Sequence, residues 1–266
     1  MAHAVLTLMS FPVELRRCVT LTCSVSALWI CSFAALQITA GAASAEARVT
    51  PHEHESSAVT PHHSTSQKLP PSGLSPEEDL AYSRFMHHSS GAAVLIIGML
   101  LLGDRMTGHR YRVLRFGSGL TWFALGLFLF IYSDLEAWPI GPAGFLESFS
   151  IPTADEWIQH HLLSMIPMVL GIYTILYRRK ESRPLWSYVV AGLATLGGVA
   201  LLIHQHFDHP DLDFVNIQHR FFAATTFFIA ASLVAERSGR FTWNGKAYLL
   251  PAGLLLLGFQ LAVYVE

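Results

Sequence analysis

Charged residues are scarce in this chain. Only 14% of its 266 residues are charged, 52% are apolar, and the mean hydropathy is +0.41. Soluble domains carry about 25% charged residues, so the composition is typical of a membrane protein that contacts a lipid bilayer. The formal net charge of −2 gives no basic surface, and it argues against a nucleic-acid partner.

Cysteine is nearly absent. The three cysteines, Cys18, Cys23 and Cys31, all lie in the first apolar run. If that run is removed, disulfides, thiolate metal sites and cysteine nucleophiles are all excluded. The chain also lacks a Gly-rich phosphate loop after a strand, an H-E-x-x-H motif and a G-x-S-x-G motif. We therefore do not expect an enzyme.

The first apolar run predicts an export signal. Arg16 and Arg17 precede an apolar stretch over 18–38, and small residues follow at 43–47. Cleavage after Ala45 or Ala47 fits the small-residue rule, which makes residues 1–47 a signal peptide. Because the apolar stretch is long, an uncleaved anchor is the alternative.

Residues 48–75 predict a disordered lead outside the cytoplasm. The segment is rich in Ser, Thr, Pro and His and has no periodic apolar pattern. Four histidines lie within twelve residues of it, so an accessory metal-capturing tract is a candidate beside a plain soluble linker. They are His52, His54, His62 and His63.

Residues 76–266 predict an all-α, polytopic membrane bundle of six transmembrane helices. The first helix begins at Ser75-Pro76-Glu77-Glu78, which combines an N-cap, an N1 proline and a capping-box Glu. A second capping box is predicted at Thr153 and Glu156. The apolar spans cover roughly 85–102, 116–133, 157–177, 185–203, 219–235 and 247–265, and each approaches the ~20 residues that cross a bilayer.

Basic residues predict the orientation. The loops after the first, third and fifth spans are rich in Arg and Lys, whereas 134–156 and 204–218 contain neither. The positive-inside rule puts the basic loops in the cytoplasm and the mature N-terminus outside it. The inner halves of the spans look apolar, which favours binding or handover of a ligand over conduction.

Histidines gather on the predicted outer side. Of the thirteen that lie after residue 47, only His109 falls in a cytoplasmic loop. His87, His160 and His219 stand at the start of the first, third and fifth spans, the last two within a shared Ile-Gln-His. Three related hairpins would explain this match, and chance is the alternative because the shared sequence is short. Polar residues in membrane helices usually face a functional interior, so the matching depth favours one shared polar or metal site.

Imidazole suits copper, zinc, iron and nickel. Glu156 and His160 are four residues apart and share a helix face. His161 points about 100° away from His160, so we expect it, like His209, to be a bystander. The predicted ligands lie at the outer ends of the spans: His87, His88, His160, His204, His206, His219, Glu156 and Asp134.

Over residues 85–265 the chain resembles bacterial membrane proteins of the copper resistance protein D type. The resemblance rests on Asp134-x-Glu136-x-Trp138-Pro139-x-Gly141, Gln159-His160, His204-x-His206 and Gln218-His219. It implies a helical bundle with metal ligands near the periplasmic helix ends, which handles copper at the inner membrane. A more distant likeness is to membrane proteins that assemble the copper site of cytochrome oxidase.

The leading interpretation is a membrane protein of copper homeostasis or resistance that binds or transports the ion at its periplasmic face. Its partners would be a periplasmic copper carrier or an oxidase assembly protein. Zinc is a second candidate metal. One alternative is a haem b electron carrier with axial histidines from two helices. The other is a non-metal assembly protein, or a sensor whose histidines titrate with the outside pH.

Overall fold

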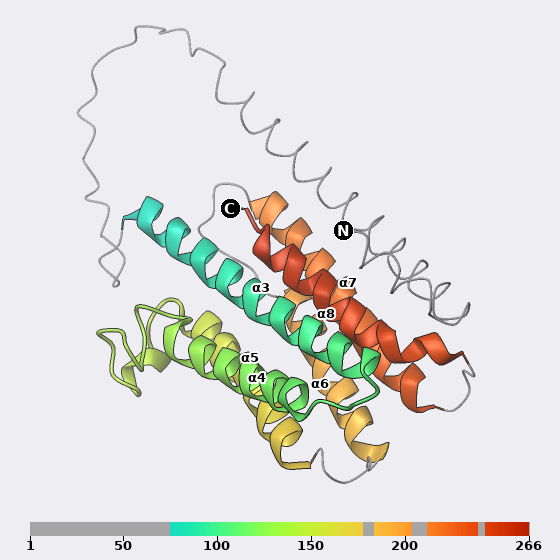
Figure 1. Ribbon diagram of the computed structural model, residues 1–266. Helices are drawn as coiled ribbons and strands as arrows, with labels where there is room; N and C mark the ends of the chain where they lie inside the picture. The colour runs from blue at the N-terminus through green and yellow to red at the C-terminus, as the bar shows by residue number, and fades with distance from the viewer. Residues whose placement is uncertain (1–74, 178–183, 204–211, 239–242, 266) are drawn as a thin grey trace, which may run out of the picture.

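The computed structural model describes residues 75–177, 184–203, 212–238 and 243–265, all of whose regular structure is helical (Figure 1). Residues 1–47 and the lead over 48–74 lie outside these ranges. The helices, in chain order, are α3 (Pro76–Met106), α4 (Arg112–Tyr132), η1 (Glu147–Phe149), α5 (Ala154–Tyr177), α6 (Pro184–Ile203), α7 (Leu212–Arg237), η2 (Asn244–Tyr248) and α8 (Leu249–Ala262). No strand occurs in the described residues, which confirms the all-α prediction.

Six of the helices are long and apolar enough to cross a membrane. Large apolar side chains cover their outward faces; Val113 and Leu196, for example, are 71% and 63% exposed. Lipid solvates such side chains at no cost, whereas water does not. The predicted six-helix membrane bundle is confirmed at this level.

Local signals explain where α3 begins. The Ser75 hydroxyl accepts from the backbone N–H of Glu78, and the Glu78 carboxylate accepts from the backbone N–H of Ser75 at 2.8 Å. This is the predicted capping box. At the predicted start of the third span, the Thr153 hydroxyl donates to the Glu136 carboxylate at 3.2 Å.

Helix bounds differ from the predicted apolar spans in one respect that affects the histidines. The helix α7 begins at Leu212, seven residues before His219, and α3 begins at Pro76, eleven residues before His87. At 3.6 residues per turn, both histidines therefore lie about two to three turns inside their helices. The predicted start of α3 at Ser75-Pro76 is confirmed, whereas α7 begins before the predicted apolar run over 219–235, in a segment for which no helix was predicted.

The bundle is built from antiparallel pairs: α3 with α8, α4 with α5, and α6 with α7. Glycines allow the closest approaches. A Cβ at Gly258 of α8 would lie 2.6 Å from the backbone nitrogen of Leu95 in α3, and one at Gly171 of α5 would lie 2.5 Å from that of Phe123 in α4. The α3–α4 and α7–α8 contacts join these pairs into one bundle.

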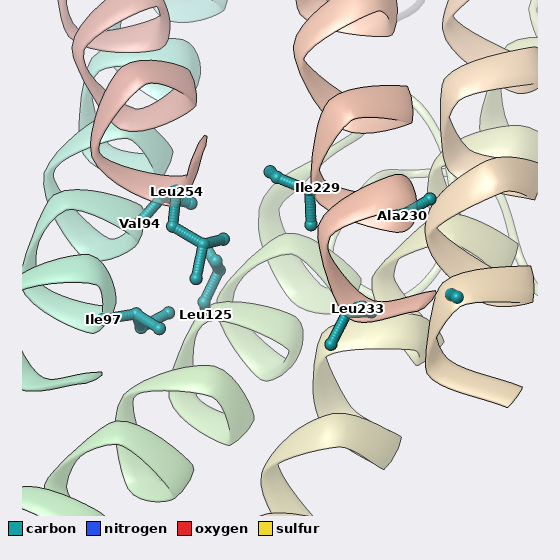
Figure 2. Packing of buried hydrophobic residues seen from close by; sticks show 8 residues of the cluster. Val94, Ile97, Leu125, Ile229, Ala230, Leu233 and Leu254 are labelled. Atoms are coloured by element: carbon teal, nitrogen blue, oxygen red, sulfur yellow. The ribbon is translucent and has the colours of Figure 1, made fainter. Parts of the chain in front are cut away.

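An apolar core joins five of the six helices at mid-height. Val94, Ile97 and Leu254 pack together between α3 and α8, while Ile229 and Leu233 extend the cluster along α7 (Figure 2). Leu125 of α4 and Ala191 of α6 belong to the same cluster. This core lies between the two ends of the bundle and separates their polar groups.

The two ends of the bundle differ in chemistry. The helices α3, α5 and α7 run in one direction and α4, α6 and α8 in the other (Figure 1). We name the end where α3, α5 and α7 begin the histidine end, since it holds His87, His160 and His219. The opposite end, with Arg105, Arg115 and Arg237, is the basic end.

Candidate functional site

Two predicted ligands meet inside the histidine end. His87 of α3 and His219 of α7 lie ring to ring, with centroids 6.1 Å apart and planes at 88°. His219 is only 3% exposed. The Nδ1 atom of His87 lies 2.9 Å from the Ser83 carbonyl oxygen, and that of His219 lies 2.9 Å from the Val215 carbonyl oxygen. Helices far apart in the sequence thus bring two imidazoles together.

These backbone contacts fix the tautomers. A carbonyl oxygen only accepts, so each Nδ1 must carry its proton and donate. In a neutral ring, the lone pair is then on Nε2. A backbone carbonyl is a common partner for the non-ligating nitrogen of a metal-bound histidine. The local structure of α3 and α7 therefore prepares both rings to act through Nε2.

The segment after α8 closes over this pair. The Tyr264 ring stacks on His87 with centroids 3.9 Å apart, and its edge faces His219 at 6.2 Å. His88 Nε2 donates to the Tyr264 carbonyl oxygen at 2.9 Å. The Gln218 amide donates to the Val265 carbonyl oxygen at 2.6 Å and accepts from the Val265 backbone N–H at 3.2 Å. His88, one of the predicted ligands, thus binds the segment that follows α8.

A second polar group lies between α4 and α5. His160 Nδ1 is 3.2 Å from Asp134 Oδ1, and His160 Nε2 is 3.9 Å from Glu156 Oε1. Burial by itself raises the pKa of the Asp134 carboxyl. The hydrogen bonds from His160 and Ser133 and the charges of His160 and His161 outweigh this effect and hold the pKa below its ordinary value. This second group is an ion-paired network.

His161 is buried, contrary to its expected role as a bystander. It is 7% exposed, and its Nδ1 donates to the Trp157 carbonyl oxygen at 3.0 Å. The rings of Phe130 and Trp157 lie 4.8 and 4.9 Å from its own, and Trp138 lies at 6.3 Å. Its Nε2 has no hydrogen-bond partner among the described residues. The α4–α5 contact thus buries His161 and leaves His160 28% exposed at its side chain.

The predicted ligands are therefore divided between two groups. His87, His88 and His219 lie between α3, α7 and α8, and Asp134, Glu156 and His160 lie at α4 and α5. Within the described ranges, no three His, Cys, Asp or Glu side chains come close enough to hold a metal ion. The rest of the predicted set lies outside the described residues: His204, His206, His52, His54, His62 and His63. The metal-binding role of these side chains stays a prediction.

The repeated Ile-Gln-His does not place its members alike. In α7, His219 is buried and donates to the carbonyl four residues earlier, whereas in α5 it is His161, one position later, that does so. The matched residue, His160, contacts Asp134 instead. Because one residue rotates a side chain by about 100°, a short sequence match does not determine which neighbour faces inward.

The basic end holds a buried carboxylate that the sequence reading missed. Asp104 of α3 is 0% exposed, and its Oδ2 accepts from His109 Nδ1 at 2.8 Å while its Oδ1 accepts from Arg115 Nε at 3.2 Å. Arg105 pairs with Glu236 of α7 at 2.6 Å. Asp104 and Glu236 lie just beyond the predicted apolar spans over 85–102 and 219–235, within the same helices. The Arg-rich loop obscured Asp104, although an acid at the end of an apolar run could have drawn attention to it.

No protein-family model matches the chain, and searches of curated proteins and of solved structures found no match. The resemblance to copper resistance protein D stays a prediction. Any functional conclusion must therefore rest on the geometry of the side chains.

Proposed function

We propose that this protein binds a first-row transition-metal ion, with copper as the leading candidate, through Nε2 of His87 and His219. The observation that carries the proposal is the pairing of these two rings, 6.1 Å apart, in the interior of the histidine end. A histidine inside a membrane helix is costly unless a partner or a ligand compensates for it. Two from different helices indicate a shared ligand.

The number of donors favours copper over zinc. Structural zinc sites almost always have four ligands, and catalytic ones have three from the protein. The part of the chain that the structure describes brings together no group of three. A monovalent copper ion accepts as few as two ligands, and imidazole is a suitable one. His204 and His206, which directly follow α6, are candidates for an additional donor.

The surroundings of the pair suit binding and handover. Among the described residues, Tyr264 stacks on His87 and Val265 binds Gln218 beside His219, and the apolar core lies farther along the same helices. If the basic end faces the cytoplasm, the pair opens toward the periplasm. The His-rich lead would then collect the ion, and a periplasmic copper carrier or an oxidase assembly protein would exchange it. This is the role in copper homeostasis or resistance that we propose.

The test is a visible absorption spectrum and an elemental analysis of the same purified sample. Copper at about one equivalent, without a strong band near 400 nm, is the expected result. Zinc in place of copper would change the assignment of the metal. A sample that takes up neither metal after incubation with cuprous or zinc ions would contradict the proposal.

A haem b carrier is the second candidate, and the same pair favours it. A haem with two axial histidines takes its imidazoles from two positions that face each other, and His87 and His219 supply such a pair from different helices. A Soret band in the purified protein, lost on His87→Ala or His219→Ala, would select haem. A pH-sensing role is the third, and it is supported by the ion pair between His160 and Asp134.

A further inference from the structure

Two fully buried glutamines in neighbouring helices have opposite surroundings. Both Gln218 of α7 and Gln260 of α8 are 0% exposed. The Gln218 amide is hydrogen-bonded through both its nitrogen and its oxygen to the Val265 backbone. Neither the nitrogen nor the oxygen of the Gln260 amide has a hydrogen-bond partner among the described residues. An amide buried in this way is costly, so the exception calls for a physical explanation.

Gln260 lies on the face of α8 that packs on α7. Gly253 is seven residues, or about two turns, before it and therefore shares its face. A Cβ at Gly253 would lie 2.8 Å from Cγ1 of Ile229 in α7. At the other end of the contact, Gln218 binds Val265. Gln260 therefore lies between these two contacts, one turn inward from Tyr264, which stacks on His87.

Thr225 brings a second unpartnered group to this interface. It is buried, and its hydroxyl oxygen also has no hydrogen-bond partner in the described ranges. Thr225 is seven residues after Gln218 and four before Ile229, so all three lie close to one face of α7, the face toward α8. Two helices thus present an amide and a hydroxyl to the same contact, at neighbouring levels.

We propose that Gln260 and Thr225 form a buried water-binding site between α7 and α8, directly inward from the His87–His219 pair. Buried waters typically make two to four hydrogen bonds to polar groups that otherwise lack partners. The amide offers a donor and an acceptor, and the hydroxyl offers both. The site extends the polar region of the histidine end inward by one turn.

The same observations show where this hydrated region ends. Ile229, one turn inward from Thr225 on α7, and Leu254 on α8 both belong to the apolar core (Figure 2). Water has no polar partner on these side chains. The proposed water site therefore does not continue past Thr225 into the apolar core.

Cysteine accessibility tests this site without any metal, so the result is independent of the proposed function. Cys18, Cys23 and Cys31 are replaced by Ser, and Thr225→Cys or Ile229→Cys is introduced into the full chain in lipid nanodiscs. Modification by a small neutral methanethiosulfonate proceeds through the thiolate, which forms only where water contacts the thiol. We expect the cysteine at 225 to react at least tenfold faster than the matched cysteine at 229.

A second substitution assigns the water to the amide. In the Thr225→Cys chain, Gln260→Leu removes both polar atoms at similar volume, and we expect the reaction to slow to the rate at position 229. Gln260→Met serves the same purpose if the Leu variant does not fold. Equal rates at 225 and 229, or a rate at 225 that Gln260→Leu leaves unchanged, would overturn the proposal.

Discussion

At the scale of single residues, the histidines of the histidine end differ in the partner of their Nδ1 atom. His87, His161 and His219 all donate from Nδ1 to the carbonyl four residues earlier, at 2.9, 3.0 and 2.9 Å. His160 instead directs Nδ1 to the Asp134 carboxylate. His160 therefore differs from the other three, because its position on the helix directs Nδ1 to a carboxylate and not to a backbone carbonyl.

The two groups of histidines give different expectations for copper affinity. His87→Ala or His219→Ala removes a proposed ligand and should weaken copper binding by at least 100-fold, since even changes behind the ligands cost about 10–100-fold. His160→Ala should weaken it by less than tenfold, because its ring belongs to the Asp134 group. Competition with a chelator of known affinity measures all three, and a dominant effect of His160→Ala would contradict the assignment of ligands.

The contrast between the two buried glutamines predicts unequal effects on stability. Gln218→Leu leaves the Val265 N–H and carbonyl without their partners and should lower the free energy of unfolding by about 1–3 kcal/mol. Gln260→Leu breaks no hydrogen bond to another described residue and removes only the contact to the proposed water, so it should cost less than Gln218→Leu. Unfolding in mixed micelles compares the two, and a larger loss from Gln260→Leu would contradict this contrast.

The lowered pKa of the Asp134 carboxyl predicts that the stability of the protein depends on pH. Its pKa in the folded protein is below its ordinary value, so it binds protons less readily when folded than when unfolded. Its stabilising effect is therefore fully present above the unfolded pKa of about 3.9 and is lost as the pH falls through the folded pKa. Asp134→Asn should cost on the order of 1 kcal/mol at neutral pH and progressively less as the pH falls through the folded pKa of Asp134. A deficit that persists at low pH would contradict this account.

At the scale of helices, glycines set the distances between the paired elements. A Cβ at Gly171 of α5 would meet the backbone of α4, 2.5 Å from the Phe123 nitrogen and 2.7 Å from the Gly119 oxygen. A Cβ at Gly192 of α6 would meet nothing within 4 Å. The first glycine is required by the packing of two backbones, whereas the second lies in open space.

This difference provides a matched pair of variants. Gly171→Ala should destabilise the bundle by about 1–3 kcal/mol, because α4 and α5 must move apart. Gly192→Ala adds the same methyl group to a helix without a clash and should be neutral or stabilising by up to ~1 kcal/mol. Thermal unfolding in detergent measures both. Equal shifts in the midpoint would mean that the α4–α5 approach is looser than described.

At the scale of the whole molecule, the sequence predicted what depends on composition and local signals. Six apolar spans and the capping box at Ser75 and Glu78 follow from hydropathy and from contacts three residues apart. Which of His160 and His161 is buried against α4 could not be predicted, because this depends on the rotation of α5 about its own axis. The unpartnered Gln260 was equally hidden, since burial depends on helices distant in sequence.

Among the described residues, the histidines and the charged side chains gather at the two ends of the bundle, with the apolar core between them. At the basic end, Asp104 and Arg115 pair, and Arg105 pairs with Glu236. At the histidine end, the rings of His87 and His219 face each other beneath Tyr264. This division is the basis of the central claim that the protein binds a metal at one end and does not conduct it through the core.

X-ray absorption at the copper edge of the loaded protein tests that claim most directly. The account predicts two imidazole nitrogens at about 2 Å from the metal, reduced to one by His87→Ala or by His219→Ala, and unchanged by the matched substitution His109→Ala at the basic end. A spectrum without imidazole scattering, or one that neither substitution in the pair alters, would contradict it.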